Sequence, residues 1–261
     1  MSPLYIDSPN PTTSELEDPS PPKRGLVSRV LEPALQFWLR SQVESVAALQ
    51  VHLEGGDRQI LSGSIPQVRL EADRAIYRGL HLTHVQICGS NIRVNIGQVI
   101  KGKPLKLLDP IPVDLDVWLQ TADVQVSLNA ALFQTALIDA LPIFAGVQIT
   151  DALGTDLQPN DLTLRDLDLQ IGVDRLRFTS TLVASNGKSI PIGIQTGLIL
   201  DSPSSLALKN PEWLPTPQSK RGLALHDLDG HLFDLGPEAN VQVLSITPEG
   251  IRIQGRLEIM P

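Results

Sequence analysis

The chain has 261 residues and a formal net charge of −8; 42% of its residues are hydrophobic, 19% are charged and only 4% are aromatic. The acidic balance, without a basic stripe carrying interleaved aromatics, argues against a nucleic-acid partner. The single cysteine, Cys88, excludes an intrachain disulfide and a cysteine-based metal site, and it is consistent with a reducing compartment.

Residues 1–23 predict a disordered tail. They contain six prolines and four acidic residues but one lysine, so they cannot bury enough apolar surface to offset the cost of ordering. The tail lacks the basic start and apolar core of a secretory signal, and no uncharged apolar run in the chain reaches the roughly 18 residues of a membrane span. We therefore expect a cytoplasmic protein, or a peripheral one on the cytoplasmic face of the plasma or thylakoid membrane.

A long helix is predicted over residues 25–50. Outside a narrow polar stripe formed by Arg29, Glu32, Gln36 and Arg40, its first half is almost entirely apolar. Such a helix needs a sheet that curls around it or a lipid that covers it. At 100° per residue its apolar side chains share one broad arc: Leu31, Leu35, Trp38, Leu39, Val46 and Leu49.

Alternating strands dominate the remainder. In the first half, Val68 and Leu70 alternate with charged residues, and similar patterns lie around residues 80–96 and 111–119. A second, shorter helix is predicted over residues 121–141, with Leu132 and Leu137 on its apolar side. Later strands are predicted at 145–152, 161–172, 174–184, 189–200, 204–209, 222–233, 239–247 and 250–259, with Asn186-Gly187 as a hairpin turn.

One pattern recurs at residues 80–87, 162–169 and 223–228. Each copy has two alternating apolar positions, a one-residue slip and further alternation, as in a strand with a β-bulge. Bulges bend strands, so the repetition favours a curved sheet. The prediction is an α+β fold: one long, highly curved antiparallel sheet wrapped around the N-terminal helix. Residues 24–261 would form a single domain, with possible lobes at 24–142 and 143–261.

No catalytic constellation is visible. His81 and His84 are three apart, which places them on opposite faces of a regular strand, and no acid or cysteine at metal-ligand spacing accompanies them. Nucleophile-elbow and glycine-rich nucleotide motifs are absent from the sequence. We predict no enzyme, no metal site and no cofactor.

Two stretches have the character of membrane-docking loops. Residues 97–112 interleave Lys101, Lys103 and Lys106 with Leu107 and Leu108, which suits an anionic bilayer. Residues 210–222 place Trp213 among prolines, as in a loop with an interfacial anchor. The alternative for both is a loop whose apolar side chains cover the core.

Residues from about 26 to about 140 resemble the LmeA-like phospholipid-binding family, in particular its cyanobacterial branch. The shared marks are Leu49-Gln-Val51, Leu61-Ser-Gly63, Tyr77-Arg-Gly79-Leu80, Gly102-Lys-Pro104-Leu105 and Leu119-Gln-Thr121-Ala-Asp123-Val124. The resemblance implies a fold similar to tubular lipid-binding proteins and a phospholipid ligand without enzymatic turnover.

These observations predict a non-catalytic phospholipid-binding or lipid-transfer protein that acts at a membrane surface. Acyl chains would lie in an aliphatic groove between helix and sheet. The alternative is a membrane-associated assembly factor that transports no lipid, whose protein partner the sequence does not identify. A third hypothesis is a hydrolase that acts on the bound lipid, which would need a nucleophile facing the groove. The candidate groove residues are Leu31, Leu35, Trp38, Leu39, Val46, Val68, Leu70, Leu132 and Leu137.

Overall fold

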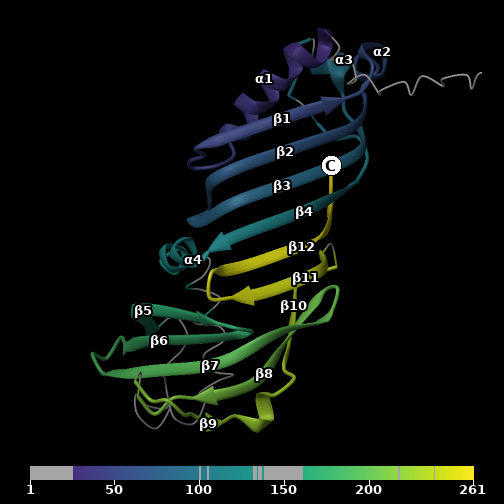
Figure 1. The fold of residues 1–261 in the computed structure, drawn as a ribbon. Helices are drawn as coiled ribbons and strands as arrows, with labels where there is room; N and C mark the ends of the chain where they lie inside the picture. The colour runs from purple at the N-terminus through teal and green to yellow at the C-terminus, as the bar shows by residue number, and fades with distance from the viewer. Residues whose placement is uncertain are drawn as a thin grey trace, which may run out of the picture.

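The chain folds into two open antiparallel sheets that lie end to end (Figure 1). The computed structural model describes residues 26–99, 101–104, 106–131, 134, 137, 161–216, 218–237 and 239–261. The first sheet has the order β1-β2-β3-β4-β12-β11, and the second has the order β10-β8-β7-β6-β5, with β9 paired to β8. The predicted antiparallel sheet is therefore confirmed, but the strands form two open sheets and not the one long sheet that was expected.

The first sheet is built from long hairpins and a returning C-terminal pair. Its strands are β1 (Ala48–Glu54), β2 (Ser64–Tyr77), β3 (Leu80–Arg93), β4 (Ile111–Gln120), β11 (Ala239–Thr247) and β12 (Gly250–Ile259). β12 pairs with β4, more than a hundred residues away in sequence, from Gly250 opposite Gln120 to Ile259 opposite Ile111. Gly250 has φ +155°, and a Cβ there would lie 2.1 Å from the Leu119 carbonyl oxygen, so only glycine fits this close approach.

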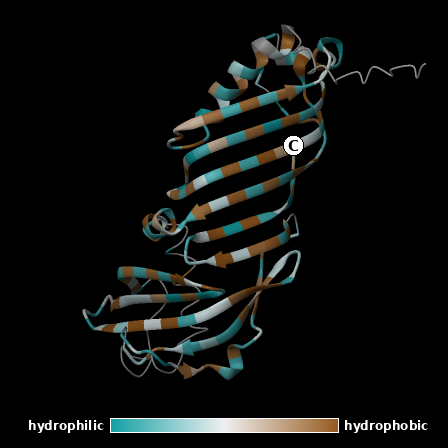
Figure 2. Cartoon of the chain, in the orientation of Figure 1, coloured by the Kyte–Doolittle hydropathy of each residue, from teal (hydrophilic) through white to brown (hydrophobic). Residues whose placement is uncertain are grey.

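The register places apolar residues in rows that cross the strands. One row runs Leu53–Val68–Gly89–Val113–Leu257, the next runs Val51–Leu70–Ile87–Leu115–Gly255, and a third runs Leu49–Ala72–Val85–Val117–Ile253. The intervening residues are mostly polar and point to the other side, so each strand shows alternating bands in Figure 2. We call the side that carries these rows the apolar face.

Short helices gather around the first sheet. α1 (Leu26–Arg40) packs against β1 and against α2 (Asp57–Leu61), and α3 (Ile96–Val99) follows β3. α2 and α3 lie at the same end of the sheet as the start of α1 (Figure 1). α4 (Thr121–Ser127) directly follows β4 and contacts β3.

The second sheet has its own core. Its strands are β5 (Leu162–Gly172), β6 (Arg175–Ala184), β7 (Ser189–Ser202), β8 (Ser205–Trp213), β9 (Leu223–Ala224) and β10 (Leu232–Asp234), with the 3-10 helix η2 (His226–Leu228) before β10. Leu182 and Ile192 are fully buried and pack with Leu164, Ile194 and Trp213.

Two features join the sheets. A buried cluster combines Val124 of α4 and Leu128, the residue after α4, with Leu169 and Phe178 of the second sheet. In addition, two turns of the second sheet meet the edge strand β11: the Asp174 N–H donates to the Ile246 carbonyl at 3.0 Å, and the Val241 N–H donates to the Pro203 carbonyl at 2.7 Å. The second sheet thereby covers an edge that would otherwise expose unpaired backbone groups.

The prediction of a helix over residues 25–50 is wrong in its second half. α1 ends at Arg40, where the Ser41 N–H bonds to the carbonyls of Phe37 and Trp38, and β1 begins at Ala48. Leu49, Val51 and Leu53 are buried on alternate positions, which is the period of a strand. The sheet does not wrap around α1, which instead lies along the β1 end.

Of the remaining secondary-structure predictions, some are confirmed and others are wrong. The strands predicted at 161–172, 174–184, 189–200, 239–247 and 250–259 and the Asn186-Gly187 turn are confirmed. The continuous strand at 222–233 is wrong, because β9, η2 and β10 occupy this range. A bulge occurs in only one copy of the recurring pattern, between Arg165 and Asp168, whereas β2 and β3 pair without a shift. The tail at 1–23 and the strand at 145–152 lie outside the described residues.

Candidate functional site

An apolar cavity of about 300 Å³ lies between α1 and the apolar face of the first sheet. Every residue that lines it is apolar or glycine, and the lining comes from α1, four neighbouring strands, the loop before β4 and the end of β12. The lining residues are Leu35, Trp38, Leu39, Val51, Ile65, Val68, Leu70, Ile87, Gly89, Ile92, Val94, Leu107, Ile111, Val113 and Ile259.

A second cavity of about 260 Å³ continues from the first. The two share Leu39, Leu70 and Ile87 in their walls, and the second adds Val43 and Val46 from the turn after α1 together with the left half of β2 and β3 (Figure 1). We call the two cavities together the groove. Its walls suit flexible hydrocarbon chains, because aliphatic side chains contact such chains without fixed geometry.

Six of the nine predicted groove residues line this space. Leu35, Trp38, Leu39, Val68 and Leu70 line the larger cavity, and Val46 lines the smaller one.

The other three are elsewhere. Leu31 packs against the buried cluster of the first sheet that includes Leu53 and Ile65, but it does not line either cavity. Leu137 packs against the cluster that contains Leu169 and Phe178 and against the core of the second sheet, so its assignment to the groove is wrong. Leu132 lies outside the described residues.

Sequence reasoning missed the contribution of β3, β4 and β12. Ile87, Val113 and Ile259 sit on strands whose alternation was recognised, but alternation does not say which face of the sheet a helix covers. Gly89 was missed as well. It leaves room on the groove floor, since a Cβ there would lie 3.1 Å from the Ile92 Cδ1 atom and 3.3 Å from the Val113 Cγ1 atom.

Two hydrogen bonds fasten α1 over the groove. The Val27 N–H donates to the Asp57 Oδ1 atom of α2 at 3.0 Å, and the Leu53 N–H of β1 donates to the Glu32 Oε1 atom at 2.9 Å. Glu32 belongs to the polar stripe that was expected to lie opposite the core, but it is half-buried and satisfies a backbone group of the sheet edge. Glu32 therefore attaches the helix to β1.

The loop that carries Lys101, Lys103 and Lys106, which we call the lysine loop, borders the groove. Lys101, Lys103 and Lys106 are exposed, as is Leu108 at 50%, whereas Leu107 is half-buried, forms a bridge with Val94 and lines the larger cavity. Within the described part of the chain, no carboxylate forms an ion pair with these three lysines. The loop thus places unpaired positive charge beside an apolar opening.

Trp213 does not behave as a surface anchor. Its side chain is 8% exposed and packs in the core of the second sheet, because β8 continues to this residue instead of ending at 209. The prediction of Trp213 as a membrane contact is therefore wrong, and the residue also belongs to a strand and not to a loop that covers the core.

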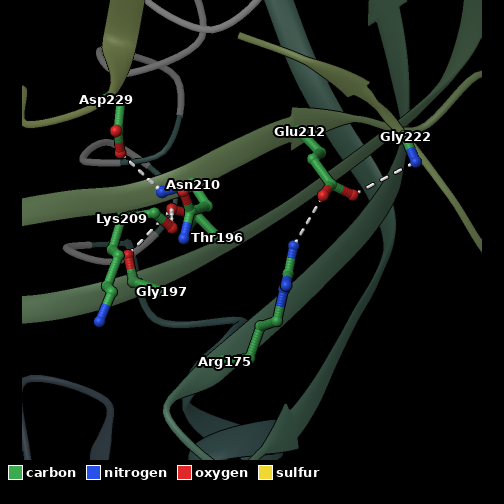
Figure 3. Close-up of polar contacts among 8 residues, drawn as sticks. All are labelled: Arg175, Thr196, Gly197, Lys209, Asn210, Glu212, Gly222 and Asp229. Atoms are coloured by element: carbon green, nitrogen blue, oxygen red, sulfur yellow. Dashed lines mark hydrogen bonds and ion pairs between the residues drawn. The ribbon is translucent and has the colours of Figure 1, made fainter. Parts of the chain in front are cut away.

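A polar hollow of about 260 Å³ lies in the second sheet, lined in part by Arg175, Asn210, Glu212 and Asp229 (Figure 3). Its polar groups bond to one another. The Arg175 Nη2 atom donates to the Glu212 Oε1 atom at 2.9 Å, and the Asn210 N–H donates to the Asp229 Oδ1 atom at 2.7 Å. The Glu212 Oε2 atom also accepts from the Gly222 N–H. The polar side chains of the hollow therefore hold neighbouring strands and loops of the second sheet together by hydrogen bonds.

The chain was compared with known proteins. The model of a family described as LmeA-like phospholipid-binding matches residues 23–256, which is nearly the whole chain. The chain belongs to this family. Neither curated proteins nor solved structures gave a match.

The LmeA-like match covers both sheets, so the second sheet is part of the family's fold as well as the groove-bearing first sheet. Among the described residues of this LmeA-like chain, no helix is both long and apolar enough to cross a membrane.

Proposed function

We propose that the groove binds the acyl chains of a phospholipid and that the protein carries this lipid to or from a membrane without chemical turnover. The observation that carries the proposal is the larger cavity, whose wall is entirely apolar and aliphatic apart from Trp38 and Gly89. Each methylene group that leaves water for such a wall contributes about 0.8 kcal/mol. A lipid can therefore be held without a strong polar site.

The groove wall also supports a non-catalytic role. The larger cavity presents no hydroxyl, thiol, imidazole or carboxylate among its lining residues, and the smaller cavity adds Gln42 and Tyr77 as its only polar side chains. Hydrolysis of a bound lipid requires an activated nucleophile or a general base at the reacting bond. We therefore propose that bound lipid leaves the groove unchanged.

The decisive experiment replaces a residue of the groove wall by a larger one, so that its side chain occupies the space proposed for the lipid. Ile87 lines both cavities, so Ile87→Trp should place an indole where acyl chains would lie. We expect at least about a tenfold loss of lipid carried from donor to acceptor vesicles, with a melting temperature close to that of the parent because the added volume enters a void. Gln86→Trp is the matched control, since Gln86 is the exposed neighbour on the opposite face of β3.

Native mass spectrometry of the purified protein provides the second arm. A lipid adduct that is present in the parent and in Gln86→Trp but depleted in Ile87→Trp supports the groove. A parent protein that carries no lipid and takes none up from liposomes would refute the proposal and favour the assembly-factor alternative.

We further propose that the lysine loop docks the protein to an anionic bilayer. Three lysines near such a surface contribute about 1 kcal/mol each. Replacement of Lys101, Lys103 and Lys106 by Gln should lower binding to anionic vesicles by about a hundredfold. The matched control replaces three exposed lysines of the second sheet and its neighbouring loops, Lys188, Lys209 and Lys220, which changes the net charge equally. Equal losses in both triple variants would contradict a local docking site.

A further inference from the structure

The outward side of α1 is apolar. Pro33, Ala34, Phe37 and Trp38 are all exposed, and their spacing places them on one stripe of the helix. Phe37 is 79% exposed and Trp38 is 48% exposed, the largest side chains of this stripe. An ordinary surface helix turns its apolar side inward and its polar side to water.

In α1 the inner side is apolar as well, and its contacts fix the orientation of the helix. Leu31, Leu35 and Leu39 pack against the sheet, and Glu32, the only acidic residue of α1, accepts the hydrogen bond from the Leu53 N–H. The negative charge of the helix is therefore directed to the sheet edge, while Arg40 in the last turn is exposed. Outward, α1 presents apolar side chains and a positive charge.

The stripe is continuous with the groove. Trp38 is exposed to solvent and also lines the larger cavity, as does Ile259, which is 41% exposed; Leu107 of the lysine loop belongs to the same wall. Aromatic side chains at the junction of water and hydrocarbon are typical of interfacial helices, which combine them with basic residues. A protein partner would also cover an apolar stripe, but it would not explain why the stripe runs into the apolar wall of the groove at Trp38.

We propose that α1 lies in the headgroup region of a phospholipid bilayer, with Phe37 inserted among the acyl chains and Trp38 at the threshold between bilayer and groove. This inference rests on the proposed function, because it assigns the route by which lipid reaches the groove. It adds a second contact to the lysine loop and makes the helix itself the membrane-facing wall.

The test uses Phe37→Asp in the full chain, since Phe37 does not line the groove. The control is Val173→Asp, because Val173 is 73% exposed at the turn between β5 and β6, away from α1. Co-sedimentation with phosphatidylcholine–phosphatidylglycerol vesicles should show about a tenfold loss or more for Phe37→Asp and no change for Val173→Asp. Circular dichroism melting confirms that both variants fold.

A second measurement separates this inference from the function on which it rests. Uptake of dihexanoyl phosphatidylcholine, supplied as dissolved monomers, should be the same in the parent and in Phe37→Asp. If the parent takes up no dissolved lipid, the proposed function fails. If uptake is intact but Phe37→Asp leaves vesicle binding unchanged, the membrane role of α1 is refuted. Loss of a concentration-dependent dimer in Phe37→Asp, with vesicle binding retained, would refute it in favour of an interface between two copies.

Discussion

Asp116 links β4 to β12 on the polar side of the first sheet. Its carboxylate accepts hydrogen bonds from the Arg252 Nε atom at 3.0 Å, the Arg252 Nη2 atom at 2.6 Å and the Gln254 Nε2 atom at 2.7 Å. The bonds from Arg252 lower the pKa of Asp116 below its usual value, burial opposes this change, and the Gln254 bond assists it. The strand pair with the longest sequence separation thus carries a bidentate ion pair.

This pair should make stability depend on pH. Because the folded-state pKa of Asp116 is lowered, its stabilising effect is present above the unfolded value of about 3.9 and is lost as the pH falls through the folded value. We expect Asp116→Asn to lower the free energy of unfolding by about 1 kcal/mol at neutral pH, a small effect because half of the Arg252 side chain is exposed. Urea titrations at neutral and at acidic pH should show the difference from the parent vanish in acid.

Asp114→Asn is the control for this prediction. Asp114 pairs with Arg256 on the same two strands, but its side chain is 58% exposed, against 24% for Asp116. We expect a smaller loss for Asp114→Asn. A loss as large as that of Asp116→Asn would show that general surface charge, and not the bidentate contact of Asp116, sets the pH dependence.

At the scale of single elements, the hydrogen bond to Glu32 attaches α1 to the edge of the first sheet. Glu32→Ala would leave the Leu53 N–H without its acceptor, which costs about 1–3 kcal/mol for a buried donor. We expect faster hydrogen exchange at the Leu53 amide and weaker protection throughout α1. Gln36→Ala, one turn further along the same stripe, should leave the Leu53 amide unchanged; equal exchange in both variants would mean that the Glu32 contact does not hold the helix.

Local patterns predict most strands, because the alternation of apolar and polar residues can be read from consecutive positions in the sequence. β5, β6, β7, β11 and β12 were found close to their true ends for this reason. The end of α1 was missed because Val46 and Leu49 fit a helical arc as well as a strand, and the helical period was extended through the turn at residues 41–45. The stripe at Phe37 was missed because a helical wheel groups apolar residues without saying which of them meet the sheet.

The groove could be predicted only in part, because local patterns do not show which strands pair with one another. Leu35, Leu39, Val68 and Leu70 follow from the amphipathic patterns of two elements close in sequence. The contribution of Ile259 depends on the pairing of β12 with β4, which no local pattern encodes. Trp213 was misplaced because the prolines around it suggested a loop, although Pro211 is buried within β8.

For the molecule as a whole, the cluster around Leu128 predicts that the sheets unfold together. Leu128 is 1% exposed and packs beside α4 against residues of the second sheet. Leu128→Ala should cost about 2–5 kcal/mol. Because both sheets contribute to the cluster, we expect hydrogen-exchange protection to fall in β4 and β12 as well as in β5 and β6.

Leu182→Ala is the comparison for that measurement. Leu182 is completely buried in the separate core of the second sheet. Its truncation should reduce protection mainly in β5 to β7. If Leu128→Ala affects only one sheet and calorimetry resolves two transitions, the two sheets are independent folding units and the junction contributes little to stability.

The apolar rows cross the strands, so the length of the apolar face is counted in strands. Neighbouring strands are about 4.8 Å apart. A hairpin inserted between β4 and β12 would therefore lengthen the face by roughly 10 Å while its width and wall chemistry stayed the same. Longer strands, by contrast, would only broaden it. The reach of such a protein along a hydrocarbon chain can thus change in discrete steps, through duplication of hairpins, without redesign of the surface that the chain touches.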